Sequence, residues 1–293
     1  MDIDVRDLIQ AGVHFGHRSS RWNPKMKPYI YKKRNLIHII DLRQTIRGLV
    51  TAEKVARAIA EQGEYILFAG TKRQAQPIVE REAQRCGMPY VTDRWPGGLL
   101  TNYVTIRKRL ERLDELEELD RTGRIGEYSK KMISSLRREK RKILRNLGGV
   151  REMDRLPGLL IVVDPAEEDI AIREAVKLEI PTIAWMDTDG DPEDIDVVVP
   201  ANDDAIGSIE IFARIMADAV LEGRQRAEIG PGEAARQTDQ AERKAAPPEE
   251  PTPAEAEAPE ETPPAEEAEE AEEAPEEAEE GEESAASEEE ATQ

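Results

Sequence analysis

The sequence has one cysteine and no hydrophobic run long enough to cross a membrane. Cys86 has no second cysteine with which to form an intramolecular disulfide, so the cysteine content gives no sign of an oxidising compartment. No apolar stretch approaches the roughly 20 residues that a membrane-spanning helix needs. The first residues also lack the basic and then apolar segments of a signal peptide. These absences predict a soluble, cytoplasmic protein with no membrane partner.

Motifs that carry catalysis are also missing. The glycine spacings of a phosphate loop and of a dinucleotide-binding loop do not occur. Gly70-Thr71-Lys72 nevertheless lies between a predicted strand and a predicted helix, where a phosphate could bind. The segment 187–191 resembles a calcium loop but has Val198 where the twelfth-position glutamate belongs, so an irregular turn is expected. With no nucleophile and base combination either, we expect no enzyme activity, no cofactor and no small-molecule substrate.

Histidine is scarce as well, with three residues in the chain. His14 and His17 could share one face of a helix and bind a metal ion together with a carboxylate from elsewhere. Two histidines do not complete a tetrahedral site, so a structural position or a place beside RNA is favoured and no bound metal is predicted. His38 lies within an apolar segment and is predicted to be structural.

Charge is distributed very unevenly along the chain. The formal net charge is -21, and residues 231–293 alone hold 24 acidic and 3 basic residues, whereas residues 1–230 hold 38 of each sign. From Ala245 onward the sequence is nearly all Glu, Ala and Pro. Such a segment cannot bury enough apolar surface to fold, so residues 230–293 are predicted to be a disordered acidic tail. The tail is a solvating appendage, or it binds a basic partner or screens the rest of the chain against the wrong RNA.

Positive charge is concentrated near the N-terminus. Seven basic residues and no acidic residue lie between Arg18 and Arg34, which creates a local positive potential regardless of the net charge. Short predicted strands at 29–31 and 36–40 would form a hairpin with a basic tip. The first group of candidate RNA-binding residues is therefore Arg18, Arg21, Lys25, Lys27, Lys32, Lys33 and Arg34.

Short apolar runs alternate with amphipathic segments over most of residues 1–229. Continuous apolar runs are typical of parallel strands that are buried on both faces. Connected by helices, such strands form a doubly wound parallel sheet, so we predict an α/β domain. The five predicted strands lie at residues 65–69, 89–91, 158–164, 181–186 and 196–199.

The segment 102–147 is too long to be a simple connection between two strands. Apolar residues recur every three or four positions on both sides of Thr122-Gly123, which predicts an inserted antiparallel coiled-coil hairpin. The spacing of its returning half predicts that Tyr128, Met132 and Leu136 lie in the apolar seam. With 14 basic and 8 acidic residues, the hairpin is also a candidate contact for an RNA backbone. Its candidate residues are Arg107, Lys108, Arg137, Arg138, Arg141 and Lys142.

A third group of candidates follows two predicted strands at the carboxyl edge of the sheet. Lys72 and Arg73 follow the first strand and are expected to be exposed there. Arg94 and Trp95 follow the second, within the segment 93–102, and offer a guanidinium and a flat ring that could stack on a base or lie against a phosphate. The alternative for the second pair is a turn with a buried tryptophan.

Several motifs, in order along residues 1–226, resemble the bacterial small-subunit ribosomal protein S2 family. They include Gln10–His17, Trp22–Met26, Phe68–Lys72, Arg94–Asn102 and Leu159–Pro165. The resemblance implies a flavodoxin-like fold and a place between the head and the body of the small subunit, where the protein binds rRNA. It further implies that the protein helps to dock ribosomal protein S1. The tail from about Gly230 departs from the family pattern.

Two other classes of function stay open at this point. One is a flavodoxin-like enzyme or nucleotide-binding switch, which the missing phosphate-loop spacing disfavours. The other is a protein-interaction adaptor that uses the hairpin and the tail away from the ribosome.

Overall fold

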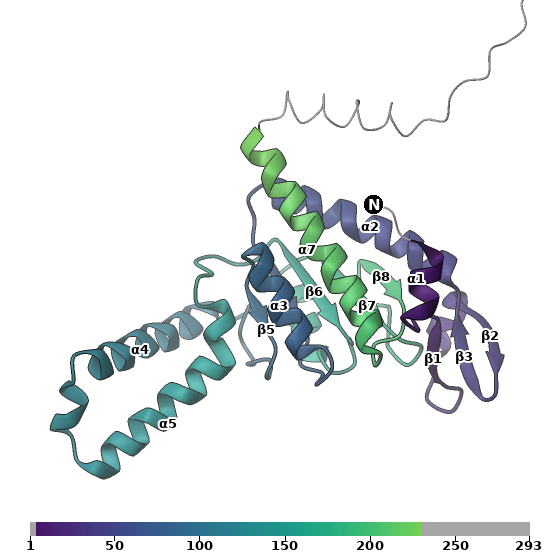
Figure 1. The fold of residues 1–293 in the computed structure, drawn as a ribbon. Helices are drawn as coiled ribbons and strands as arrows, with labels where there is room; N and C mark the ends of the chain where they lie inside the picture. The colour runs from purple at the N-terminus through teal and green to yellow at the C-terminus, as the bar shows by residue number, and fades with distance from the viewer. Residues whose placement is uncertain (1–3, 230–293) are drawn as a thin grey trace, which may run out of the picture. The chain divides into compact units, whose positions relative to one another are not determined.

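The structure is a computed structural model that describes residues 4–229. The predicted tail lies outside the described residues, so the domain boundary at 229/230 stays a prediction. The helices are α1 (Val5–Gln10), α2 (Leu42–Glu61), α3 (Gln76–Cys86), α4 (Tyr103–Arg121), α5 (Lys130–Leu147), α6 (Asp169–Lys177) and α7 (Ile206–Ile229) (Figure 1). The strands are β1 (Phe15–Arg18), β2 (Ile30–Arg34), β3 (Ile37–Ile40), β4 (Ile66–Ala69), β5 (Tyr90–Val91), β6 (Leu159–Val163), β7 (Thr182–Met186) and β8 (Val197–Pro200). None of these helices is long and apolar enough to span a bilayer.

Five strands form the parallel sheet that the sequence predicts. Their order is β5-β4-β6-β7-β8, and each neighbouring pair is parallel. Counted along the chain this is 2-1-3-4-5, the order of flavodoxin-type doubly wound sheets. The strand order reverses between β4 and β6, and ligands of such folds bind outside the carboxyl ends of the strands at that point. The carboxyl edge near β4 and β6 is therefore the first place to look for a ligand site.

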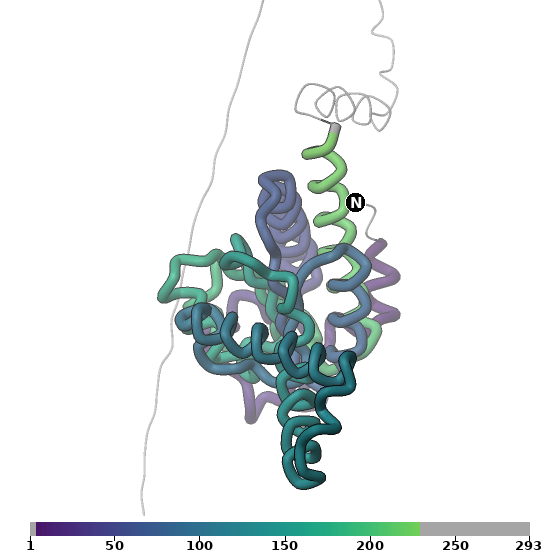
Figure 2. Tube along the Cα trace, turned by 90° about the vertical axis from the view of Figure 1, so that its left-hand side faces the viewer, coloured from purple at the N-terminus to yellow at the C-terminus, as the bar shows by residue number. Residues whose placement is uncertain are grey.

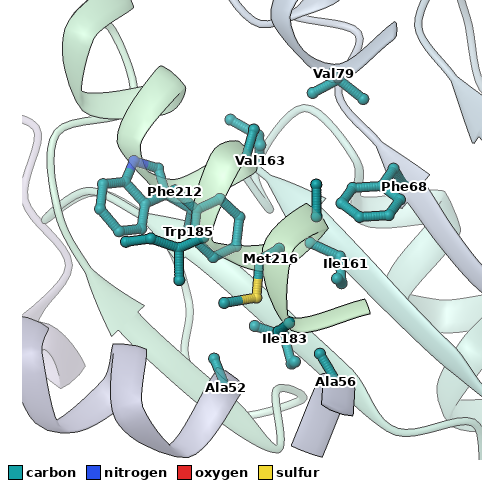
Figure 3. Packing of buried hydrophobic residues seen from close by; sticks show 14 of the residues in the cluster. Ala52, Ala56, Phe68, Val79, Ile161, Val163, Ile183, Trp185, Phe212 and Met216 are labelled. Carbon is teal, nitrogen blue, oxygen red and sulfur yellow. The ribbon is translucent and has the colours of Figure 1, made fainter. Parts of the chain in front are cut away.

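Alternate side chains of the central strands enter two separate cores. One face of the sheet packs against α2, α3 and α7, and there the ring of Trp185 stacks on Phe212 with centroids 4.8 Å apart (Figure 3). The opposite face packs against α6, the first turns of α4 and the last turn of α5, with Leu160 and Met186 in the shared core. Strands buried on both faces explain why their sequences are continuously apolar.

The N-terminal region forms a second, antiparallel sheet in the order β1-β3-β2. The sequence predicts the β2–β3 hairpin but not β1. The predicted basic tip is wrong, because β2 continues through Arg34 and the turn consists of Asn35 and Leu36, at φ 50° and 62°. A two-residue turn with both central residues at positive φ matches the twist of a hairpin and needs no wider loop. Lys32, Lys33 and Arg34 therefore lie on a strand.

Helices α4 and α5 lie side by side as the predicted hairpin (Figures 1 and 2). Near the sheet they share the main core, whereas farther out they bury a small cluster of their own, Leu116, Ile125 and Leu136. Tyr128 and Met132 are exposed, so their predicted place in the seam is wrong. Tyr128 precedes α5, which begins at Lys130, and the seam uses Ile133 in place of its neighbour Met132.

Candidate nucleic-acid interface

All seven basic side chains of the N-terminal segment are exposed. Within residues 4–229, Lys25 is the one member of the group with carboxylate partners, since its ammonium pairs with Asp191 and Glu193. The other six have no carboxylate within ion-pair distance among the described residues. Their positive charge is therefore available to an external anion.

The β2–β3 hairpin places its basic residues on two faces. Lys32 and Arg34 lie on one face and border a hollow whose floor includes Phe15, Ile37 and Ile39. Lys33 points to the opposite face, because alternate residues of a strand point in opposite directions. One ammonium and one guanidinium group beside an apolar floor suit a sugar–phosphate backbone, with the floor against the ribose or a base.

The N-terminal sheet is fastened to the turn that follows β7. The backbone N–H of His17 lies 3.1 Å from both the Asp187 carboxylate and the Thr188 hydroxyl, which accept from it, and the N–H of Asn23 donates to the Thr188 carbonyl over 2.8 Å. Gly16 makes this approach possible. A Cβ atom there would lie 2.8 Å from Thr188 Cγ2 and 2.9 Å from Asp187 Oδ1.

We expect Gly16→Ala to lower stability by about 1–3 kcal/mol, because the new methyl group overpacks a contact between two sheets. Thermal unfolding of the purified variant measures the effect. Gly126→Ala is the matched control, since no atom lies within 4 Å of the Cβ it would add. Equal melting temperatures for the two variants would show that Gly16 is not a packing requirement.

The prediction that Lys72 is exposed at the carboxyl edge of the parallel sheet is wrong, because this side chain is partly buried. Its ammonium lies 3.1 Å from Asp164, 2.7 Å from Asp203 and 2.6 Å from Asp204. Burial lowers the pKa of Lys72, but these carboxylates outweigh it and the pKa is raised. The side chain already neutralises acids of the chain itself, whereas its neighbour Arg73 is exposed.

The phosphate position suggested by Gly70-Thr71-Lys72 is also occupied by the protein. Helix α3 begins at Gln76, so the tripeptide does not form a helix N-terminus. The N–H of Thr71 donates to the buried carboxylate of Glu168 over 2.7 Å. The carboxylate of Glu168 thus occupies the position where a phosphate would bind, at the point where the strand order reverses.

Trp95 is buried, with 6 % of its surface exposed, so the structure favours the buried alternative and leaves no ring face for a base. The carboxylate of Glu174 organises this turn. It accepts from the indole N–H of Trp95 and from the backbone N–H groups of Gly98, Leu100 and Thr101. Burial raises the pKa of Glu174, but these donors more than offset it and hold the pKa below its usual range. Arg94 remains exposed beside this turn.

The candidate residues of the helical hairpin differ in exposure. Arg107 is half-buried and donates to the backbone carbonyl of Met153 over 3.2 Å. The other five are exposed and have no carboxylate partner among the described residues: Lys108, Arg137, Arg138, Arg141 and Lys142. Four of these five come from α5, so free positive charge is concentrated on the returning helix.

The two N-terminal histidines do not share a helix face, because His17 lies on β1 and His14 just before it. Asp187, whose Oδ2 is 2.8 Å from Nδ1 of His17, raises the pKa of this histidine to about 9. His38, predicted to be structural, is buried on β3, and burial lowers its pKa.

Sequence reasoning missed the acids that organise these sites, chiefly Glu174, Asp187 and Asp203. One signal was present: Asp164 and Asp187 directly follow apolar strands, where parallel sheets collect their polar side chains.

The described residues define an α/β protein whose ligand edge is filled by its own ion pairs and whose free basic groups lie on peripheral elements. The family model for ribosomal protein S2 matches residues 8–223. The chain belongs to the ribosomal protein S2 family.

Two relatives support the assignment. The "Small ribosomal subunit protein uS2" of Rhodopirellula baltica is 54 % identical over 220 residues, which cover 75 % of this chain and 85 % of the relative. The protein of the same name from Geotalea uraniireducens is 49 % identical over 228 residues, covering 78 % and 89 %. The family consists of ribosomal proteins that are not enzymes, which agrees with the predicted class of function.

Proposed function

We propose that the protein is a structural constituent of the small ribosomal subunit in the cytoplasm and binds small-subunit rRNA through its N-terminal sheet. The observation that carries the proposal is the set of six exposed basic side chains without described carboxylate partners, four on a sheet that is fastened to the main fold and two, Arg21 and Lys27, in the segment between β1 and β2. The names of the two relatives support the place in the small subunit. In this account the protein supports translation by positioning rRNA.

The other candidate residues contribute unequally to this proposal. Arg73, Arg94 and the five exposed cations of the helical hairpin have side chains that can reach a phosphate. Lys72, Trp95 and Arg107 act indirectly, because their polar groups are already engaged within the protein. Lys25 contributes less to an external contact, since its ammonium is already paired with Asp191 and Glu193.

The finer parts of the proposal concern partners. The site between the head and the body of the subunit and the docking of ribosomal protein S1 follow from the family resemblance, and other small-subunit proteins are the expected neighbours. The N-terminal sheet offers exposed aromatic side chains, Phe15 and Tyr31, that suit a protein neighbour beside the rRNA.

The salt dependence of rRNA binding tests the proposal. Binding of the purified chain to protein-free small-subunit rRNA should weaken linearly on a plot of log K against log salt concentration, because each lysine–phosphate contact releases a counterion. Nucleotide titration should give no saturable signal. Salt-independent rRNA binding would contradict the proposal, and saturable nucleotide binding would support the switch alternative.

A further inference from the structure

A groove bordered by α1, α2 and α7 has no role in the proposed rRNA contact. Its volume is about 310 Å³, and the three helices that border it are seen in Figure 1. Leu8, Ile215 and Ala219 close the bottom of the groove, and Ile211 of α7 stays partly exposed in it. An apolar side chain of a partner can therefore reach an apolar floor between the helices.

Helix α1 adds exposed apolar side chains next to the groove. Val5 and Ile9 lie four residues apart on one face of the helix and are 44 % and 49 % exposed. That face is next to the one that carries Asp4, Asp7 and Leu8 into the groove, since successive helical residues are turned by about 100°. An occupant of the groove can thus cover Val5 and Ile9 as well.

The rim of the groove carries an excess of negative charge. Five carboxylates line it, those of Asp4, Asp7, Glu53, Asp218 and Glu222. Arg57 and Arg85 are the described cations that pair with members of this set, and Arg214 lies in the lining itself. Asp4 and Asp7 have no cation within ion-pair distance among residues 4–229. Three arginines therefore face five carboxylates.

We infer that this groove binds a lysine- and arginine-rich segment of a neighbouring small-subunit protein, with apolar side chains of that segment on the floor. The source of the segment rests on the proposed function, whereas its chemistry rests on the groove. An acidic rim repels the rRNA backbone and attracts cations, which favours a basic protein segment over nucleic acid. Proteins that share an rRNA surface carry basic residues, because they neutralise phosphates there.

The combination of floor and rim fits a segment better than it fits a small ligand. Apolar anchors in a groove between helices, with complementary charges around them, are the usual features of sites that bind an amphipathic helix. The candidate rRNA contacts lie on the N-terminal sheet, the α4–α5 hairpin and the carboxyl edge of the parallel sheet. The protein thus has separate surfaces for rRNA and for a protein neighbour.

Site-specific photocross-linking in assembled subunits tests the proposal. The full chain is produced in cells with p-benzoylphenylalanine in place of Arg214, which is exposed and lines the groove. Small subunits are isolated on a low-salt gradient and irradiated, and the cross-linked peptide is sequenced by mass spectrometry. We expect one cross-link, to a lysine- and arginine-rich segment of another small-subunit protein. The same photoreactive residue in place of Gln225, about three turns farther along α7 and outside the lining, should not give this cross-link.

A charge reversal tests the role of the rim. Asp7→Lys, combined with the photoreactive residue at position 214, should lower the cross-link yield roughly threefold or more, because it places like charges together. Glu61→Lys is the matched control, since Glu61 is an exposed acid at the end of α2 that does not line the groove. Equal yields for the two reversals would overturn the proposed basic character of the occupant.

The remaining outcomes separate this proposal from the proposed function. A chain that does not migrate with small subunits would overturn both. A chain that does migrate with them but cross-links to rRNA, to a second copy, to another part of the same chain or to nothing would overturn the groove proposal alone. If circular dichroism shows that the first variant is unfolded, the photoreactive residue is placed at Glu222 instead, which lines the same groove and is exposed.

Discussion

Replacement of Lys32, Lys33 and Arg34 with alanine is expected to weaken binding to small-subunit rRNA at least tenfold, because roughly two or three phosphate contacts are lost. The three side chains are exposed and have no described carboxylate partners, so their removal leaves the fold intact. The slope of log K against log salt should fall by about 2 to 3, since each lost contact removes about one unit. Filter binding over a salt series, with circular dichroism as the folding check, measures both effects.

The control removes three exposed basic residues from α1 and α2 instead, Arg6, Arg47 and Lys54. It changes the net charge equally, so a loss confined to the first variant locates the contact on the hairpin. Because Lys33 lies on the opposite face, the Lys32/Arg34 double variant should show most of the loss. An unchanged slope in the triple variant would show that the β2–β3 hairpin does not contact rRNA.

Glu174→Gln is expected to be the most destabilising of the polar substitutions. Three backbone N–H groups now donate to the two oxygens of the Glu174 carboxylate. Glutamine replaces one of these oxygens with an NH₂ group, which cannot accept, so at least one buried N–H loses its acceptor. Each such loss costs about 1–3 kcal/mol, and the turn that carries Arg94 should loosen with it. Urea denaturation at neutral pH measures the change, with Glu167→Gln as control because Glu167 is exposed and lies just before α6, the helix that contains Glu174.

The pH dependence of this effect has a definite sign. The pKa of Glu174 is lower in the folded chain than in the unfolded chain. The stabilisation by the carboxylate is therefore present above the ordinary glutamate pKa and is lost as the pH falls through the folded value. The stability difference between the original chain and Glu174→Gln should shrink as the solution is acidified, and a difference that grows would contradict the assignment.

The parallel sheet could be predicted from sequence because its strands are short apolar runs. A strand that is buried on both faces admits few polar residues, so its own composition reveals it. Strand β1 carries no such signal, since its sequence is Phe-Gly-His-Arg and two of its four residues are exposed. What holds it is the turn at Asp187 and Thr188, 170 residues farther along the chain.

The candidate residues divide in the same way. The exposure of the Arg18–Arg34 segment could be expected, because it contains no acid that would pair with its charges locally. Nothing in the sequence indicates that the Lys72 ammonium forms ion pairs, since the three carboxylates that it contacts come from two distant loops. Trp95 likewise has its partner, Glu174, 79 residues away. A charged or aromatic residue after a strand looks the same in sequence whether solvent or another loop covers it.

Sedimentation of a low-salt lysate through a sucrose gradient tests the central claim most directly. The full chain should migrate with the small ribosomal subunit and move to the top of the gradient as salt is raised. A chain that stays at the top of the gradient at low salt, at the same expression level, would contradict the ribosomal account and favour an adaptor that acts away from the ribosome.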